Sequence, residues 1–423
     1  MEIGFSLCDE IEEEILLRLP TKSISRFSCV SKCWYNKFTS FEFAQKHLKR
    51  QRQTHANNLN LMLHGSGGPL QSVRFSGIYS DKDDAKTIPT KHNQPLLVDC
   101  ENYIFHVVGS CDGVLLILAT SSTGFSRCLG YVIYIWNPTT GVYKTLPRQL
   151  SSMPDSIVLG FGPDLATTEY NNNNHYKVLL LETVYGRTIR DPPIHNFNMY
   201  TTRTNSWKPL LQNIGPYGYF FPHPQGMILA YNSLHYVAEV RTTDDDGDLY
   251  FNNSIMSFDL KDDKFRVLPI VDPTRTLLQV CALNGDLCAL SQSFTDDDSN
   301  FYSYYLWRMK NFGVKNEECW TKICSIDCRL AMDKPFTILS LLHVLEDGQI
   351  LFYAQPRYLH QEKPFIVSYH IENEKASFLV QCNVPYWSIP VVYEESLISP
   401  NAVSTAEEEP IWRILNIPGK NNE

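Results

Sequence analysis

The chain lacks the features that mark membrane-spanning and secreted proteins. No apolar run approaches the roughly 20 residues that a membrane-spanning helix needs. Near the N-terminus, Glu2, Asp9 and Glu10 stand where a signal peptide has a basic region and an apolar segment. The cysteines are scattered, and several, such as Cys281 and Cys288, lie inside apolar strand patterns, which is typical of reduced thiols. These absences predict a cytoplasmic or nuclear protein.

The chain also lacks an excess of positive charge. Lys and Arg number 37 against 46 Asp and Glu, which gives a formal net charge of −9 and an isoelectric point near 5.8. A protein with this balance is not expected to bind nucleic acid. The 423 residues, of which 43% are hydrophobic, are enough for two or three domains of about 150 residues with a large core.

Catalytic and metal-binding constellations are missing as well. The segment His-Gly-Ser-Gly-Gly at 64–68 weakly resembles a phosphate-binding loop, but no strand-to-helix pattern follows it. Cys29 with Cys33, and Cys324 with Cys328, are pairs four residues apart without a second pair at zinc-site spacing. The sequence therefore predicts no catalytic residue, no metal site and no cofactor.

Helical patterns are concentrated in residues 5–48. A first helix is indicated by apolar residues at helical spacing, namely Ile11, Ile15, Leu16 and Leu19. Asp9 is the expected N-cap, with Glu12 completing a capping box, and Pro20 ends the helix. Two more short helices are expected. Thr21 would cap the second, and their apolar residues are Ile24, Phe27, Val30, Trp34 and Phe38.

Three helices of about ten residues cannot bury all these apolar side chains among themselves. The residue pattern alone leaves two solutions open, a permanent partner protein or packing on the rest of the same chain. A resemblance favours the partner. The run L-x-D-E-I-x-x-E-I-L-x-R-L-P-x-K-S-I-x-R-F-x-C-V-S-K-x-W, from Leu7 to Trp34, resembles the F-box of plant F-box proteins.

The resemblance implies that this segment binds the Skp-type adaptor of an SCF (Skp–cullin–F-box) ubiquitin ligase and, through it, the cullin and RING subunits. The residues implied to contact the adaptor are Leu7, Ile11, Ile15, Leu16, Leu19, Pro20, Ile24, Val30 and Trp34. Cys8 stands where the family usually has proline, so a fixed backbone angle at the helix entry is lost.

The remaining chain repeats a β-rich unit. Five units, each with four expected strands, start about 50–65 residues apart, as propeller blades do. They cover residues 106–147, 157–210, 227–269, 279–323 and 341–380. In most units a tight turn joins the first two strands: Asp112-Gly113, Asn284-Gly285 and Asp347-Gly348. The expected outermost strands carry Tyr143, Trp207, Phe265, Trp320 and Phe378.

Strand-like segments near the two ends of the body, at 58–64, 73–79 and 388–398, predict a further blade that closes the propeller. A β-sandwich is the alternative fold, but it would not explain so regular a four-strand unit. The body resembles the F-box-associated, kelch-like domain of the same plant family, through CDG…IWNPTTG…LP, GFGPD…YKVL and SFDL, although a full kelch signature is absent. The expected organisation is an all-α F-box (1–48), a linker (49–58), an all-β propeller (59–400) and a tail (401–423).

Loops between the second and third strands should emerge together on one face of the propeller. They are 119–130, 185–195, 241–253, 291–301 and 355–365. Two carry dense acidic runs, Asp244, Asp245, Asp246 and Asp296, Asp297, Asp298, and this face is our candidate for contact with a target protein of basic or mixed charge. The alternative is that these long polar loops are ordinary solvent-exposed surface without a binding role.

The function implied by the resemblance is that of a non-catalytic substrate receptor in an SCF ligase, without contact to a membrane or nucleic acid. A propeller enzyme and a non-degradative F-box scaffold are the alternatives. Similar plant proteins act in pollen recognition at the self-incompatibility locus or control immune receptors, and the residues do not choose between these roles.

Overall fold

The structure, a computed structural model, describes most but not all of the chain. The described residues are 8–54, 59–63, 70–74, 90–92, 103–121, 131–147, 154–165, 175–186, 193–210, 226–243, 249–294, 302–327, 336–345, 348–356, 363–381 and 389–401.

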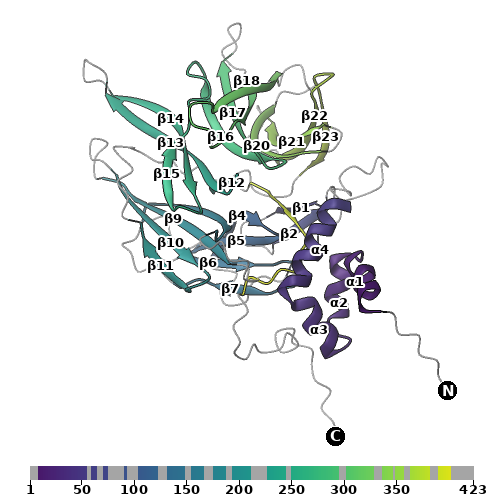
Figure 1. The fold of residues 1–423 in the computed structure, drawn as a ribbon. Coiled ribbons are helices and arrows are strands. Elements are labelled where there is room, and N and C mark those ends of the chain that lie inside the picture. Colours follow the sequence, from purple (N-terminus) through teal and green to yellow (C-terminus); the bar gives the residue numbers. More distant parts are fainter. Residues whose placement is uncertain are drawn as a thin grey trace, which may run out of the picture.

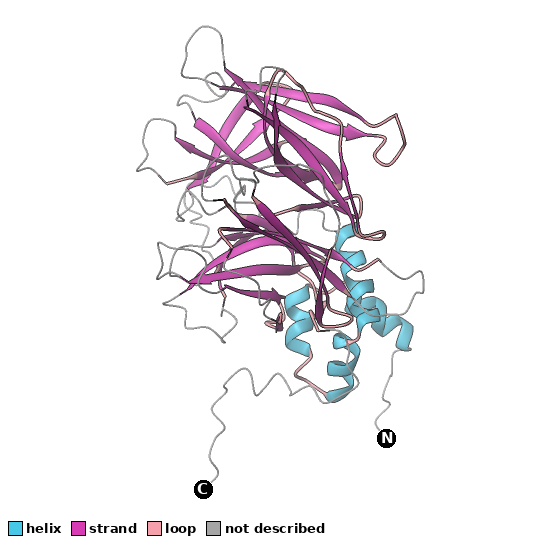
Figure 2. Cartoon of the chain, turned by 90° about the vertical axis from the view of Figure 1, so that its left-hand side faces the viewer, coloured by secondary structure: helices cyan, strands magenta, loops and turns pink. Residues whose placement is uncertain are grey.

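Residues 8–54 form a helical unit, called the hook below, at one side of a β-rich body (Figure 1). Its helices are α1 (Asp9–Leu17), α2 (Thr21–Phe27), α3 (Lys32–Thr39) and α4 (Phe41–Thr54). The figures agree that these helices gather at one edge of the body and that the rest of the described chain is strands and connections (Figures 1 and 2).

The helix starts differ from the expected ones. Cys8, not Asp9, is the N-cap of α1, and it makes no side-chain capping hydrogen bond. Its φ of −68° is the angle that proline would have fixed, so the native backbone at this position is unchanged by the cysteine. Pro20 occupies the cap position of α2, which makes Thr21 the first helical residue. Helix α3 has a side-chain cap, in which the Ser31 Oγ accepts a hydrogen bond from the Trp34 N–H. Helix α4 has another, in which the Ser40 Oγ accepts from the Phe43 N–H.

Helix α4 corrects the expected linker, because residues 49–54 continue it. Its buried side is Phe43, Ala44, His47, Leu48 and Gln51. Two of those positions hold polar side chains that bond the carbonyl of Leu19, His47 through Nε2 at 2.9 Å and Gln51 through Nε2 at 3.3 Å. Because polar residues interrupt the apolar spacing on the buried side of α4, the sequence pattern did not predict this helix.

The body consists of six four-stranded antiparallel sheets, the blades of a propeller. Each of the five repeat units forms one of them. Blade 1 is β4 (Tyr103–Cys111), β5 (Val114–Ser121), β6 (Tyr131–Trp136) and β7 (Tyr143–Thr145). Blade 2 is β8 (Ser156–Pro163), β9 (Tyr176–Val184), β10 (Ile194–Thr201) and β11 (Ser206–Pro209). Blade 3 is β12 (Ile228–Ala230), β13 (Ser233–Thr243), β14 (Leu249–Asp259) and β15 (Lys264–Val267).

Blade 4 is β16 (Thr276–Leu283), β17 (Asp286–Phe294), β18 (Tyr302–Lys310) and β19 (Cys319–Asp327). Blade 5 is β20 (Phe336–Val344), β21 (Ile350–Pro356), β22 (Phe365–His370) and β23 (Lys375–Gln381). The closing blade combines β24 (Val391–Glu394) with β1 (Leu59–Leu63), β2 (Gln71–Arg74) and β3 (Thr90–Lys91).

Pairing between the two ends of the body closes the ring. Strand β24 pairs antiparallel with β1, with Asn60 opposite Tyr393 and Leu61 opposite Val392. The innermost strands contact one another in the order β24, β4, β8, β12, β16, β20 and back to β24. This closed order of six separate sheets excludes the β-sandwich alternative, which would have two large ones.

Apolar clusters hold neighbouring blades together, and two tryptophans add a directed bond. Trp207 in blade 2 donates its indole N–H to the carbonyl of Pro147 at the end of blade 1, at 2.7 Å. Trp320 in blade 4 repeats this bond to the carbonyl of Pro269 at the end of blade 3, at 2.9 Å. The recurring Leu-Pro pairs and outer-strand tryptophans of the sequence are thus contacts between blades.

Candidate interaction surfaces

Helix α1 turns part of its apolar side to solvent. The side chains of Ile11 and Ile15, one helical turn apart, are 51% and 48% exposed, and Val30 after α2 is 67% exposed. Exposed β-branched side chains of this size gain roughly 1.5–3 kcal/mol each when a partner buries them fully. The exposed side of the hook is therefore suited to an apolar partner surface.

Two acidic residues of α1, Glu12 and Glu13, pair with the other hook helices, whereas Asp9, Glu10 and Glu14 are exposed. Glu12 pairs with Lys37 of α3 at 3.4 Å, and Glu13 pairs with Lys46 of α4 at 3.0 Å. Lys46 also pairs with Glu42 at 2.8 Å, and the hydrogen bonds that its ammonium group donates to the Glu42 and Glu13 carboxylates raise the pKa of Lys46. The usual arrangement of an amphipathic helix, apolar inward and charged outward, is therefore partly reversed.

The residues expected to contact the adaptor fall into distinct groups. Ile11, Ile15, Pro20 and Val30 are exposed. Leu19 and Trp34 are partly buried against the core of the hook. Leu16 and Ile24 are 4% and 0% exposed and belong to that core, and contact of these residues with an adaptor stays a prediction. Leu7 lies outside the described residues.

The hook's part of the apolar cluster that it shares with blades 1 and 2 is built around aromatic rings in consecutive contact. Ring centroids of Phe27 and Trp34 are 5.8 Å apart, those of Trp34 and Phe38 5.6 Å, and those of Phe38 and Phe43 5.2 Å. The fully buried His47 stacks on Phe43, and burial lowers the pKa of its imidazole. Trp34 thus supports the hook from within, in addition to any role at its surface.

The hook is joined to the propeller by ion pairs as well as by apolar packing. Arg52 of α4 donates to both carboxylate oxygens of Glu394 and to Asp112 in the first turn of blade 1, the latter at 2.8 Å. The bond to Glu394 raises the pKa of the guanidinium. Lys22 of α2 pairs with the almost fully buried Glu395 at 3.0 Å. No sequence pattern predicts these pairs, because Arg52 and Asp112 are 60 residues apart in the chain and the other two pairs more than 300.

The opposite end of the strands is the candidate recognition face. In blade 1 the hook contacts the turn after β4, and the connection from β5 to β6 leaves at the other end of these strands. Figure 1 shows that β13 and β14 of blade 3 also extend away from the hook. Asp244, Asp245, Asp246, Asp296, Asp297 and Asp298 lie outside the described residues, so their place in the loops on this face stays a prediction.

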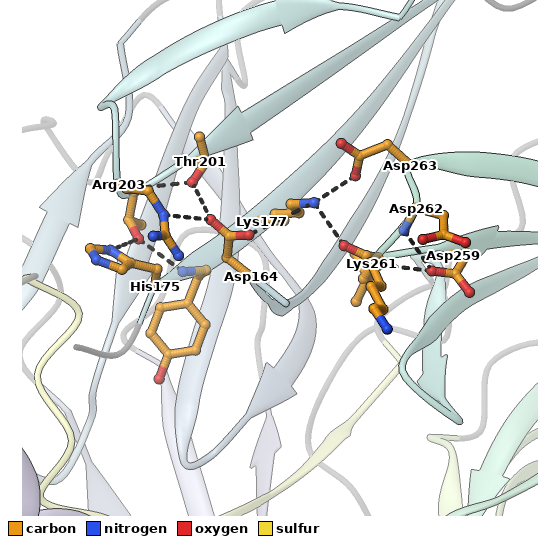
Figure 3. Close-up of polar contacts among 12 residues, drawn as sticks. Asp164, His175, Lys177, Thr201, Arg203, Asp259, Lys261, Asp262 and Asp263 are labelled. Atoms are coloured by element: carbon orange, nitrogen blue, oxygen red, sulfur yellow. Dashed lines mark hydrogen bonds and ion pairs between the residues drawn. The ribbon is translucent and has the colours of Figure 1, made fainter. Parts of the chain in front are cut away.

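A group of buried and half-buried charges lies between blades 2 and 3 (Figure 3). The Lys177 ammonium contacts Asp263 at 2.5 Å, the carbonyl of Leu260 at 2.7 Å and Asp164 at 3.8 Å. Asp164 also accepts from the Thr201 hydroxyl and from Arg203 Nε. The Lys177 side chain points toward Asp164 and Asp263, and Arg203 points toward Asp164, so opposite charges are matched as in a structural ion-pair network.

Within the described ranges, no group of three or more His, Cys, Asp or Glu side chains is arranged to hold a metal ion. The cysteines described, Cys29, Cys33 and Cys324 among them, are free thiols. None of the helices in the described part of the chain has the length and apolarity needed to cross a membrane.

Comparison with known proteins was made for the whole chain. Residues 5–46 match the F-box domain family, and residues 61–400 match the F-box associated beta propeller domain family. The F-box protein At3g07870 of Arabidopsis thaliana is 27% identical and covers 93% of this chain and 91% of its own. The putative F-box/kelch-repeat protein At3g17570 of the same plant is 22% identical, over 92% and 94%.

Among solved structures, the GH93 α-L-arabinofuranosidase of Fusarium graminearum matches with a TM-score of 0.40 at 10% identity. The match covers 70% of this chain and 86% of the enzyme. A likeness at this level carries no conclusion about the chemistry of this chain.

Proposed function

Since this chain belongs to the family of F-box proteins with an F-box-associated β-propeller domain, we propose that it is the substrate-recognition subunit of an SCF-type ubiquitin ligase. The hook binds a Skp-type adaptor, which brings the cullin and RING subunits. The propeller binds a target protein and raises its effective concentration at the site of ubiquitin transfer. The chain itself performs no chemistry in this role.

One observation supports adaptor binding above the others, the exposed isoleucine pair on α1. Glu12 and Glu13 beside it are paired with Lys37 and Lys46, so an apolar partner that docks on the isoleucine pair leaves these two carboxylates paired. Free thiols in the described residues agree with a reducing compartment, and we place the protein in the cytoplasm or nucleus.

Adaptor binding is tested by replacing Ile11 and Ile15 with glutamine, which favours helix and leaves the hook core untouched. Since about half of each side chain is already buried, the double variant should lose about 2–3 kcal/mol of binding energy, a roughly 30- to 150-fold rise in Kd measured by calorimetry. Ile270→Gln, at an isoleucine 66% exposed on the propeller, is the matched control. Unchanged adaptor affinity in the α1 variant would contradict the assignment.

For the target, we propose a protein with a basic or mixed-charge surface that docks on the face opposite the hook. Acidic loops there steer association more than they add affinity. Changing Asp244, Asp245, Asp246, Asp296, Asp297 and Asp298 to Asn should slow association with a captured target and flatten its salt dependence. Thermal stability and adaptor binding should hardly change. An unchanged rate and salt slope would leave these loops as ordinary surface.

A further inference from the structure

The segment 394–398, called the closing strap below, follows directly from the innermost strand of the closing blade. It begins with Glu394, the last residue of β24, and continues through the buried Glu395 and Ser396 to Leu397 and Ile398. Its residues contact blade 1, the closing blade and the hook at the same time.

Blade 1 holds the strap through its two turns. Asn137, fully buried in the WNPTTG turn, donates its amide to the carbonyls of Ser396 and Ile398 at 3.0 and 2.8 Å. Its side-chain oxygen accepts from the backbone of its own turn. Gly113 has φ of +78°, and a Cβ there would lie 2.6 Å from the Glu394 carbonyl. The CDG and WNPTTG motifs of the sequence thus form the two turns of blade 1 that contact the closing strap.

The hook holds the same strap from the other side. Arg52 binds Glu394, and Lys22 binds Glu395, which also lies 3.4 Å from Arg74 of β2. Leu397 and Ile398 belong to one apolar cluster with Leu48 of α4 and with residues of blade 1. The hook is therefore packed largely on residues whose position depends on closure of the propeller.

We propose that the closing strap positions the hook: Glu394 and Glu395 fix the orientation of the adaptor-binding helices relative to the recognition face. They can do so only when β24 has paired with β1. The hook therefore takes up its fixed orientation at the same step in which the propeller closes. The consequence for ubiquitin transfer rests on the proposed function, whereas the coupling itself does not.

The test measures the distance between the two parts of the full chain by double electron–electron resonance. Spin labels go on the exposed positions Asn36 of α3 and Lys310 of blade 4. The background replaces every cysteine by serine except the four that are buried among the described residues: Cys111, Cys281, Cys288 and Cys324. The native strap should give one narrow distance distribution, and Glu394→Gln with Glu395→Gln should broaden it at least twofold.

A second variant, Arg52→Gln with Lys22→Gln, removes the same pairs from the hook side and leaves the strap sequence intact, so it should broaden the distribution equally. Glu318→Gln, which removes the pair with Arg266 at 2.7 Å between blades 3 and 4, is the control and should stay narrow. A narrow distribution in both double variants overturns the proposal. The affinity for the adaptor is measured in parallel. If the native chain does not bind the adaptor, the proposed function is refuted, whereas the conclusion that the closing strap orients the hook depends only on the distance measurement.

Discussion

At the scale of single residues, buried charges in this propeller act between blades. Lys177 belongs to β9 of blade 2, yet its nearest oxygens are on the turn that follows β14 of blade 3. Its side chain is 3% exposed, as is that of Asp164, while Asp263 is 32% exposed. Removing one partner of a buried pair leaves the other uncompensated, which costs more than the pair contributes.

Lys177→Ala should therefore lower the free energy of unfolding by about 3–5 kcal/mol, measured by urea denaturation. The control is Lys261→Ala on the neighbouring turn, where the side chain is exposed and the effect should stay within about 0.5 kcal/mol. Equal stabilities of the two variants would mean that the network between blades 2 and 3 carries no net stabilisation.

His235 makes the propeller sensitive to acid. Its ring is fully buried and its Nε2–H donates to the Ala230 carbonyl at 3.0 Å. Burial, the largest cause, lowers its pKa to about 4. The unfolded state, with a pKa of about 6.5, binds a proton first as pH falls, so stability is complete above about pH 6.5 and decreases toward pH 4.

At pH 5 this single histidine should cost about 2 kcal/mol relative to pH 7.5. The measurement is urea unfolding at both pH values for the native chain and for His235→Gln, whose pH-dependent loss should be smaller by that amount. Identical pH dependence of the two proteins would show that the buried imidazole is not the acid-sensitive group.

At the scale of elements, the sequence predicted what is periodic and missed what is not. Helices α1 to α3 and the repeated blades follow alternating or helical apolar patterns, so they could be located. Helix α4 was not among the three expected helices, since His47 and Gln51 occupy its inward side. The sequence also could not predict that Ile11 is exposed while Leu16 is buried. The spacing of apolar residues defines the apolar side of a helix but does not say which part of that side a neighbouring element covers.

Proline substitution tests the extent of α4. Arg50→Pro removes a helix hydrogen bond and should destabilise the hook by about 3 kcal/mol, whereas a linker would tolerate it. Arg50→Ala, which keeps the helix, is the control. All described helices lie in residues 9–54, so circular dichroism at 222 nm during heating reports on the hook. A melting curve of the proline variant that matches the alanine variant would contradict the helical assignment.

At the scale of the whole molecule, closure of the ring depends on residues from the far end of the chain. Truncation after residue 384 removes β24 and the closing strap, exposes the edges of β1 and unseats the hook. The truncated protein should unfold at lower temperature and less cooperatively in calorimetry. Truncation after residue 401 keeps both elements and should melt like the full chain. A residue-384 truncation as stable as the full chain would contradict closure through the termini.

The proposed recognition role needs an adaptor surface on one side of the molecule and a second face at the opposite ends of the strands. The most direct measurement isolates the intact chain and the Ile11→Gln, Ile15→Gln variant from plant cells after proteasome inhibition and quantifies ubiquitin on the proteins bound to each. A substrate receptor predicts the same bound proteins in both, ubiquitylated with the intact chain and several-fold less so with the variant. Equal ubiquitylation in the two samples would contradict the account.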